Sequence, residues 1–539
     1  MYTVKKKSLI LQGMTTTRRK YPIGTYTFEK FIEEGYSYID KTDLVWKIAH
    51  EANYIFLSRP RRFGKSLLTT TLKSYFEGRK DLFEGLKIMG LETEWKAYPT
   101  FRFDLSGIKE LPIGNMAYEL RRSVAYYEKK YGFVSDAKDP GKALGLLINS
   151  IFDATGQKSV IILDEYDAPL LNYLDKPEPL EEVRRILKEF YTPLKESDAY
   201  LHYVFITGIT KFSQLSIFST INNLINVSLM PEYEAICGLT EDEVYDNFKE
   251  EIAQIAEIYK KPVEWAKQKV KDKYDGYHFS SAKTDIYNPF SVLTAMLQKK
   301  LGNFWFSTGH SASLARIIMS FGTDLSEVDG VQAAESSFDR PTEAMDNAIP
   351  LLYQAGYITI KDYDIDSESY TLGIPNGEVR VGLMENLMPL NFKTSELAMN
   401  DMAIRFKKAI IKNDIEGALL ALKSFFASIP YPENKETVLK TAEQMEFYYK
   451  RLFFMAFSFM NVQLYTEVPQ AVGRPDVIMF LGDTVYVYEI KLDGTAAEAM
   501  KQINDLNYAL PYENQGKKVV KIGIGFSTET RTFEEWEII

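Results

Sequence analysis

The sequence predicts an α/β protein in which two α/β domains are separated by a mostly helical middle. From Tyr21 to about Met230, short apolar runs alternate with amphipathic stretches, a pattern typical of a parallel sheet with crossover helices. Residues 239 to about 335 are mostly helical, as are residues 395–465, and strands surround one helix from there to the end of the chain. A chain of 539 residues is long enough for several such folding units.

Five short apolar segments are the candidate strands of the first domain. Each is short enough for a strand and apolar enough to be buried on both faces, as the strands of a parallel sheet are. They are YIFLS (54–58), TFRFDL (100–105), VIILDEY (160–166), YVFITG (203–208) and NLINVSLM (223–230).

The rest of the chain predicts a helical lid, a small mixed unit and a second α/β domain. The run AMDNAIPLLYQAGYITIKDYD predicts a helix followed by a strand, and SYTLGIPNGEVRVGLMENLM predicts a strand followed by a helix, an order that resembles a winged helix. Near the end, the strands VIMF, TVYVYEIK and VVKIGIGF surround the helix TAAEAMKQINDLNYAL. The predicted units are a tail (1–20), the first α/β domain (21–235), a helical lid (236–335), a winged-helix-like connector (336–395) and a second α/β domain with a helical N-terminal part (396–539).

Composition excludes several classes of protein. The formal net charge of −10 provides no overall basic field for nucleic acid, so any phosphate contact must come from local clusters. Cys237 is the only cysteine, which excludes a disulfide within the chain and a zinc–cysteine cluster and suits a reducing cytosol. The longest apolar stretch, Leu452 to Met460, is about half of the ~20 residues that a membrane-spanning helix needs. We therefore expect a cytoplasmic protein with no membrane partner.

A phosphate-binding loop is predicted after the first strand. Gly64, Lys65 and Ser66 follow that strand and precede a helix, where backbone N–H groups and the helix dipole hold phosphate, the lysine meets the β- and γ-phosphates and the serine binds Mg²⁺. The full GxxxxGK[ST] pattern would have glycine at position 59, where this chain has Arg59. The alternative is a surface turn that contains Gly-Lys-Ser by chance.

A partner motif lies about a hundred residues downstream. Four apolar residues lead into Asp164 and Glu165, the Walker B form, in which Asp164 would hold Mg²⁺ through water and Glu165 would orient the attacking water. The alternative is a solvated strand end. Thr207 and Thr210 follow the next strand, where such enzymes keep a polar sensor of the γ-phosphate, although a hydroxyl that only satisfies a loop is the other interpretation.

Three arginines and one later segment have two interpretations each. Arg59, Arg61 and Arg62 either contact phosphate oxygens or are solvated or paired loop charges. The segment YDGYHF (274–279) is either functional or, as we favour, a hydrogen-bonded turn.

A second group of charged residues, which could form a catalytic site, lies near the carboxyl end of the chain. Glu489 and Lys491 project to one face of a strand because side chains alternate, and a hairpin turn brings Asp476 towards them. Two carboxylates can hold one or two Mg²⁺ ions, and the lysine can position the hydroxide, which is the set that phosphodiester cleavage requires in the PD-(D/E)xK pattern. The alternative is a solvated Glu-x-Lys pair and a Pro-Asp turn.

Further members of this second site are predicted. The helix after the strand carries Gln502, which would orient the metal-bound water or a phosphate or else be a polar residue on a helix face, and this helix also leads to Tyr508. An acid from an earlier helix is expected as a further ligand. Glu446 is the first candidate and Glu467 the second.

Several motifs together resemble a known family. The runs SRPRRFGKSL, LDEYDAPLL, ITGITKFSQLSIFSTINNL, KYDGYHF and YNPFSVL resemble the predicted AAA-ATPase-like family, related to the archaeal-type and STAND ATPases, and VVKIGIGFSTETRTFEEW resembles the nuclease domain that accompanies it. The resemblance implies a five-stranded ASCE-type P-loop core with ATP and Mg²⁺ in residues 21–235, a restriction-endonuclease-like domain in 396–539, and tolerance of Arg59. The expected nucleotide-binding residues are Arg61, Arg62, Gly64, Lys65, Ser66, Leu67, Asp164 and Thr207; the catalytic residues are Glu165, Asp476, Glu489, Lys491 and Gln502; and the metal ligands are Ser66, Asp164, Glu446, Asp476 and Glu489.

Three functional hypotheses follow. The first is Mg²⁺-dependent cleavage of nucleic acid, DNA rather than RNA, under the control of ATP binding or hydrolysis. The second is a STAND-like switch in which ATP drives assembly, as a homo-oligomer, and the nuclease fold only binds nucleic acid or protein. The third treats both sites as relics, and it predicts no thermal shift with ATP.

Overall fold

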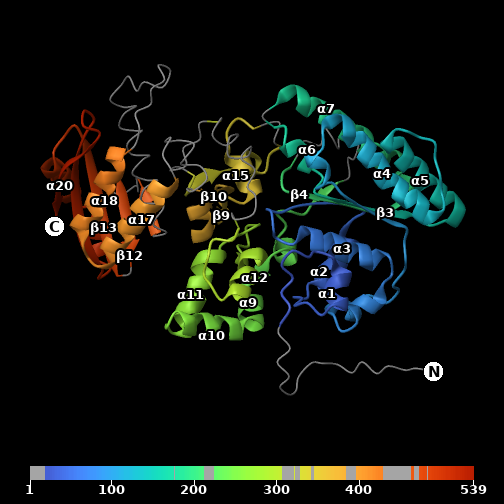
Figure 1. The fold of residues 1–539 in the computed structure, drawn as a ribbon, viewed down its shortest axis with the longest axis horizontal. Coiled ribbons are helices and arrows are strands. Elements are labelled where there is room, and N and C mark those ends of the chain that lie inside the picture. Colours follow the sequence, from blue (N-terminus) through green and yellow to red (C-terminus); the bar gives the residue numbers. More distant parts are fainter. Residues whose placement is uncertain are drawn as a thin grey trace.

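The computed structural model describes residues 19–174, 176–211, 224–305, 321, 328–341, 345–383, 396–428, 463–466, 473–481 and 483–539. Figure 1 shows one α/β part at each end of the long axis, with the helices α9–α12 and a small sheet between them. The boundaries predicted from the sequence for these units stay predictions.

The first domain is built on a five-stranded parallel sheet with the strand order β2-β3-β4-β1-β5. Its apolar strands are buried on both faces: Ile55 and Leu57 join the core on one side, whereas Tyr54 and Phe56 join the core on the other. The predicted five-stranded sheet is confirmed, although β5 is shorter than the predicted strand. The strands are β1 (Tyr54–Ser58), β2 (Thr100–Asp104), β3 (Ser159–Asp164), β4 (Leu201–Gly208) and β5 (Ile225–Asn226).

Amphipathic helices cover both faces of this sheet (Figure 1). In α7, Leu180, Val183 and Leu187 recur at helical spacing, so they form one buried stripe. The helices α1 (Phe28–Glu33), α2 (Thr42–Glu51) and α3 (Lys65–Phe76) pack in one core, and α4 (Ile113–Tyr131), α5 (Pro140–Thr155), α6 (Ala168–Leu171), α7 (Pro177–Tyr191) and α8 (Pro193–Glu196) pack in the other.

The carboxyl ends of four neighbouring strands, β2, β3, β4 and β1, meet at one edge of the sheet. In register, Ser58 of β1 lies opposite Gly208 of β4, and Asp164 of β3 lies opposite Asp104 of β2. Because all these strands are parallel, the loops after them converge at the same edge. This edge positions the first site.

The middle of the chain is a helical unit with its own core. It begins at a capping box. The Thr240 side chain accepts from the backbone N–H of Glu243, and the Glu243 side chain accepts from the backbone N–H of Thr240. Val244, Ile255 and Val270 are among its buried residues. The elements are β6 (Leu239–Thr240), α9 (Glu241–Asn247), α10 (Lys249–Ile258), α11 (Val263–Tyr274), β7 (Ile286–Tyr287) and α12 (Pro289–Gln298).

A three-stranded antiparallel sheet follows, with the order β8-β10-β9. It is attached to the helical unit by the segment YDGYHF, because the backbone N–H of His278 donates to Thr359 Oγ1 at 2.9 Å and the same hydroxyl donates to the His278 carbonyl at 2.8 Å. The elements are β8 (Val331–Ala333), α14 (Glu335–Phe338), α15 (Ile349–Ala355), β9 (Thr359–Asp364) and β10 (Ser369–Gly373).

The C-terminal part contains a mixed five-stranded sheet with the order β11-β12-β13-β14-β15. Only β13 and β14 pair in parallel, and α20 is the crossover between them. Gly523 allows α20 to approach closely, since a Cβ at this position would lie 2.5 Å from the carbonyl oxygen of Ala496. The elements are α17 (Glu396–Ile411), α18 (Ile415–Ser428), β11 (Gln463–Thr466), β12 (Val477–Leu481), β13 (Thr484–Leu492), α20 (Ala496–Asp505), α21 (Leu510–Glu513), β14 (Lys518–Ser527) and β15 (Thr532–Ile538).

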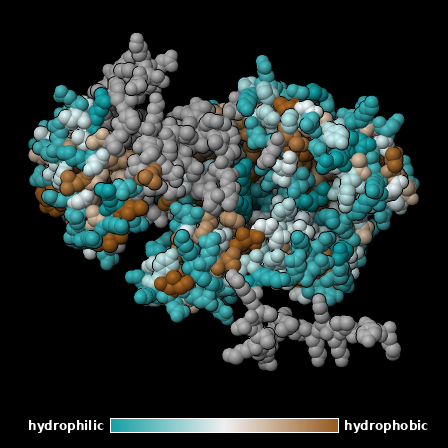
Figure 2. Space-filling view, in the orientation of Figure 1, coloured by the Kyte–Doolittle hydropathy of each residue, from teal (hydrophilic) through white to brown (hydrophobic). Residues whose placement is uncertain are grey.

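The described residues on the face drawn in Figure 2 are mainly hydrophilic, with hydrophobic residues in small separate patches. Within the ranges that the structure describes, no helix combines the length and the apolar character needed to cross a bilayer.

Candidate functional site

The loop after β1 has the geometry of a phosphate-binding loop. Gly64 lies in the left-handed region (φ 98°, ψ 17°) immediately before α3, a conformation that glycine adopts at little cost. Lys65 is only 6% exposed, and its Nζ donates to the carbonyl oxygens of Arg59 at 2.8 Å and Pro60 at 3.0 Å. Burial lowers the pKa of Lys65, while Glu165 opposes that shift. The loop therefore holds a desolvated cation at a helix N-terminus.

A cavity of about 450 Å³ opens beside this loop, which is in the size range of small-ligand sites. Its walls come from the segments on both sides of α1, from α2, the phosphate-binding loop, the ends of β2 and β3, and the helical unit. Most of the lining is apolar, and two acids, Asp104 and Glu165, belong to it. Lining residues include Tyr26, Tyr38, Ile39, Arg62, Gly64, Lys65, Ser66, Leu67, Asp104, Glu165, Leu239, Phe248 and Phe290.

Asp164 ends β3 and is completely buried. Its Oδ2 accepts from Thr69 Oγ1 at 3.0 Å and lies 2.5 Å from Nη2 of Arg102. Its Oδ1 is buried and has no hydrogen-bond partner among the described residues. A buried carboxylate oxygen without a partner lowers the stability of the fold. Asp164 Oδ1 is therefore a suitable ligand atom for a cation.

Glu165 lines the cavity next to Asp164. Its backbone is left-handed, with φ 49°, which turns its side chain away from the strand direction. Burial raises the pKa of Glu165, with Asp164 adding to the rise and Lys65 opposing it. Glu165 and Lys65 thus face the same space, as the sequence predicts.

Thr207, near the end of β4, and Thr210, just after it, are hydrogen-bonded within the protein. Thr207 Oγ1 donates to the carbonyl of Leu57 at 2.6 Å. Thr210 donates from both its backbone N–H (2.6 Å) and its hydroxyl (2.7 Å) to Oδ2 of the buried Asp167. These bonds tie the ends of β1, β3 and β4 together. A contact of Thr207 with a nucleotide stays a prediction.

The three arginines have different surroundings. The guanidinium of Arg59 is buried and donates to the carbonyls of Ser58, Ser228 and Tyr233, so the interpretation of Arg59 as a phosphate contact is wrong for this structure. Its burial among carbonyls explains why an arginine can replace the first glycine.

Arg62 lines the cavity and lies 3.8 Å from the ring centroid of Phe290. Arg61 accepts from Trp305 Nε1 through its carbonyl at 3.3 Å.

The second site lies on β13 and its neighbours. Asp476 precedes β12, and its Oδ2 accepts from the backbone N–H of Ile490 at 2.8 Å, which brings it to the end of β13. Glu489 and Lys491 project from the same face of β13, with Lys491 Nζ 3.1 Å from Glu489 Oε1. Glu489 is 2% exposed, and its Oε2 has no hydrogen-bond partner within the described part of the chain.

Electrostatics at the second site favours a bound cation. Burial raises the pKa of Glu489 to about 7, and the charge of Asp476 adds to the rise while Lys491 opposes it. A pKa this high means that the ionised carboxylate lacks compensating charge. An Mg²⁺ ion would supply it, so the residues fit the expected metal.

Gln502 of α20 belongs to this cluster. Its Oε1 accepts from Lys491 Nζ at 2.5 Å, and its Nε2 donates to Tyr508 OH at 3.2 Å. The structure therefore brings Asp476, Glu489, Lys491 and Gln502 together. Glu446 and Glu467 lie outside the described residues, so the additional acid stays a prediction.

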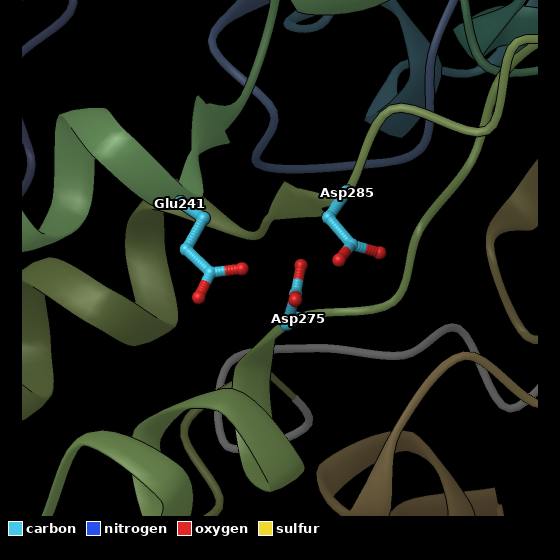
Figure 3. A group of neighbouring side chains, drawn as sticks. All are labelled: Glu241, Asp275 and Asp285. Atoms are coloured by element: carbon cyan, nitrogen blue, oxygen red, sulfur yellow. The ribbon is translucent and has the colours of Figure 1, made fainter. Parts of the chain in front are cut away.

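A third acidic group lies between the helical unit and the small sheet. Glu241, Asp275 and Asp285 point towards one another (Figure 3), with one oxygen from each within 4.8 Å of the others. Lys271 Nζ lies among them, 2.5 Å from Glu241, 3.3 Å from Asp285 and 3.8 Å from Asp275. His278 adds a contact of 2.8 Å to Asp285. The lysine already supplies the cation here, which supports the interpretation of YDGYHF as a hydrogen-bonded turn.

Sequence reasoning missed three residues of the first site: Thr69, Arg102 and Asp104. Arg102 contacts both other residues, at 3.0 Å to Thr69 Oγ1 and 3.3 Å to Asp104 Oδ2. The available signal is a pair of charged residues within the otherwise apolar segment TFRFDL. A charge in a buried strand calls for a partner, but the sequence does not name it.

Comparison with known proteins identifies the families of both α/β domains. The family model described as predicted AAA-ATPase matches residues 22–218, and a protein of Azotobacter chroococcum mcd 1, described as "Uncharacterized protein in vnfD 5'region", is 30% identical over 527 residues. That match covers 96% of this chain and 98% of the relative. The chain belongs to the predicted AAA-ATPase family. Residues 444–536 of this AAA-ATPase family member match the PD-(D/E)XK nuclease superfamily.

Two solved structures match this chain with low TM-scores. One is the Aeropyrum pernix ORC2 protein in ADPNP–ADP complexes, with 11% identity, coverage of 64% of this chain and 93% of that chain, and a TM-score of 0.25. The other is Drosophila ORC bound to poly(dA/dT) DNA and Cdc6, with 12% identity, coverage of 56% and 44%, and a TM-score of 0.21.

Proposed function

We propose that the protein binds and hydrolyses ATP in its N-terminal domain and that ATP controls a Mg²⁺-dependent nuclease in its C-terminal domain. The substrate is nucleic acid, DNA rather than RNA, and a homo-oligomer is the assembly we expect. The observation that carries the nuclease proposal is the buried Glu489 Oε2, which has no hydrogen-bond partner among the described residues and lies beside Asp476 and Lys491.

In the nuclease domain, each residue has a separate task. Asp476 and Glu489 would hold the metal, since carboxylate oxygens are the ligands that Mg²⁺ prefers. An Mg²⁺ ion held there would supply water activation, since a bound divalent cation lowers the pKa of water. Lys491, whose Nζ donates to Gln502 Oε1 at 2.5 Å, would help to position the attacking water and would stabilise the developing phosphate charge.

In the ATPase domain, the burial of Lys65 favours phosphate binding. Among the described residues, its ammonium donates to the two backbone carbonyls of Arg59 and Pro60, and phosphate oxygens would be stronger partners for it. Ser66 and Asp164 would hold Mg²⁺, and Oδ1 of Asp164, which has no partner in the part of the chain that the structure describes, is the available atom. Glu165 would orient the attacking water.

The test is cleavage of supercoiled plasmid, linear duplex, single-stranded DNA and RNA, with Mg²⁺ or EDTA and with or without ATP. We expect Mg²⁺-dependent cutting of DNA that disappears in Asp476→Ala, Glu489→Gln and Lys491→Met. Glu513→Gln is the matched control, because Glu513 is an acid of the same domain that pairs at the surface with Lys521. Equal cutting by the parent and all three site variants would contradict the nuclease assignment.

The ATP-driven switch remains the second candidate, and contacts between the ATPase domain and the following units favour it. Trp305 donates to the Arg61 carbonyl in the phosphate-binding loop, and Lys211, just after β4, pairs with Asp339 at 2.7 Å. In this case Glu165→Gln, which should bind ATP without turnover, would lock the assembled state, while the Asp476 and Glu489 variants would behave as the parent. Because a homo-oligomer is expected under both candidates, cutting by the Asp476 and Glu489 variants separates them, and sedimentation of Glu165→Gln with and without ATP tests the locked assembly of the second.

A further inference from the structure

Arg102 lies on β2, the edge strand of the ATPase sheet that is next to β3, and its side chain is 13% exposed. It is in β2, in register with Ile162, and two residues further along β2 Asp104 is in register with Asp164. Side chains alternate along both strands, so Arg102, Asp104 and Asp164 share one face of the sheet. Tyr127 of α4 fixes the Arg102 backbone, because its OH accepts from the Arg102 N–H at 2.8 Å and donates to the Arg102 carbonyl at 2.7 Å.

The Arg102 guanidinium holds one oxygen of Asp164. Nη2 lies 2.5 Å from Asp164 Oδ2 and 3.3 Å from Asp104 Oδ2, and Nε donates to Thr69 Oγ1 at 3.0 Å. Thr69 in turn donates to the same Asp164 Oδ2. One carboxylate oxygen therefore has two partners, whereas the other, Oδ1, is buried and has none among the described residues.

This asymmetry has a physical consequence. A buried carboxylate with one oxygen fixed by two donors cannot rotate without breaking both bonds, so its second oxygen keeps one direction. The guanidinium also offsets the negative charge gathered by Asp104, Asp164, Glu165 and Asp167 at this edge of the sheet.

We propose that Arg102 is a positioning residue of the ATPase site, which holds Asp164 Oδ2 so that Oδ1 is directed to the water shell of Mg²⁺. The inference rests on the proposed ATPase function. A cation beside a metal ligand also competes with the metal, which is the opposite effect. The two effects have opposite signs in a Mg²⁺ titration.

The experiment is a Mg²⁺ titration of ATP hydrolysis by the full chain, together with ATP binding in EDTA. For Arg102→Gln we expect the Mg²⁺ concentration at half-maximal rate to rise roughly 10–100-fold, the range typical of lost outer-shell partners, while ATP affinity in EDTA stays unchanged. Arg102→Lys keeps the charge but not the forked geometry, so it should show a smaller rise. Arg121→Gln is the matched control, because Arg121 makes a part-buried pair with Glu128 within α4.

Each outcome decides the question. An unchanged Mg²⁺ requirement in Arg102→Gln would overturn the inference, and a lower requirement would show that Arg102 opposes the metal. If a thermal melt shows that Arg102→Gln does not fold, Arg102→Lys replaces it in the titration. An unchanged Mg²⁺ requirement in Arg102→Lys would then overturn the inference that Arg102 positions Asp164. If the parent and Arg121→Gln bind no ATP at all, the proposed ATPase function itself is wrong, and the inference is wrong with it.

Discussion

At the scale of single residues, Lys65 and Glu489 are charged groups buried without a full set of charged partners. Lys65 has backbone carbonyls as its hydrogen-bond acceptors, and Glu489 has one oxygen with no donor among the described residues. Burying a charge is unfavourable unless a partner compensates it. Both residues therefore indicate where a ligand of opposite charge would be stabilised.

We predict that Lys65→Ala abolishes ATP binding and leaves the fold intact. The change removes the phosphate-facing cation, while the lost hydrogen bonds involve two carbonyls of the same loop. Calorimetric titration with ATP measures the loss, and a thermal melt checks the fold. Lys73→Ala is the control, since Lys73 lies on the same helix but pairs with Glu77. Unchanged ATP affinity in Lys65→Ala would contradict the site.

We predict that Mn²⁺ binding at the nuclease site strengthens as the pH rises through about 7. Metal binding needs the ionised carboxylate, and the pKa of Glu489 is raised to about 7, so the ionised fraction grows from about 10% at pH 6 to about 90% at pH 8. The parent should bind Mn²⁺ about tenfold more tightly at pH 8, and Glu489→Gln should lose this dependence.

The same shift predicts how stability depends on pH without metal. The folded pKa of Glu489 lies above its ordinary value of 4.5, so its favourable contribution is complete below 4.5 and is lost as the pH rises through 7. Added Mn²⁺ should restore more thermal stability at pH 8 than at pH 6. An equal thermal shift at both pH values would contradict this account of Glu489.

At the scale of elements, the phosphate-binding loop is packed directly against α15 of the small sheet unit. Gly356 ends α15 in the left-handed conformation (φ 86°), and a Cβ there would lie 2.6 Å from Cβ of Pro60. Real Cβ contacts are never this short, so a side chain at this position must displace the loop. The loop geometry therefore depends on an element about 290 residues away in sequence.

We predict that Gly356→Ala destabilises the fold and weakens ATP binding. The backbone strain costs about 1–2 kcal/mol, and the overpacking against Pro60 adds roughly 1–3 kcal/mol. Gly132→Ala is the matched control, because Gly132 also ends a helix in the left-handed region (φ 78°) but has open space around its Cβ. Gly132→Ala should lose only the stability that the backbone strain costs, and its ATP affinity should be unchanged. Chemical denaturation and calorimetry measure the two effects, and equal losses in both variants would refute the packing argument.

At the scale of the whole molecule, the carboxyl end of β4 in the ATPase sheet is attached to the unit that follows. Lys211 lies directly after the Thr210 turn, its Nζ pairs with Asp339, and its backbone N–H donates to Gln354 Oε1 at 2.8 Å. Burial raises the pKa of Asp339, while Lys211 opposes the rise. A conformational change at the end of β4 would therefore alter the contacts of Lys211 with Asp339 and Gln354 in the small sheet unit.

We predict that Lys211→Met destabilises the protein more than Asp339→Asn. The first change leaves a buried carboxylate without its cation, which costs roughly 1–3 kcal/mol, whereas the second leaves a lysine that can reach solvent. In the nuclease assay, both variants should reduce the effect of ATP on cutting without changing ATP-independent cutting. Equal stability of the two variants, measured by denaturant unfolding, would contradict the assigned burial of Asp339.

The local sequence was sufficient to predict the motifs and most strands. Apolar runs of strand length located β1 to β4, and Gly64-Lys65 and Asp164-Glu165 stand at the ends of such runs, where their chemistry requires them. The alternation of side chains placed Glu489 and Lys491 on one face of β13 without any knowledge of the tertiary structure. These features depend on neighbours within a few residues, which a sequence displays directly.

Other features were decided by the tertiary structure alone. Arg59 is next to the phosphate-binding loop in sequence, yet its guanidinium turns to carbonyls of Ser228 and Tyr233, about 170 residues away. Arg102 meets Asp164 only because β2 and β3 are neighbours in the sheet, and strand order is set by crossover packing rather than by local pattern. Partners of buried charges are chosen by which elements come together, so a sequence can show that a buried charge needs a partner, and only the packed fold supplies it.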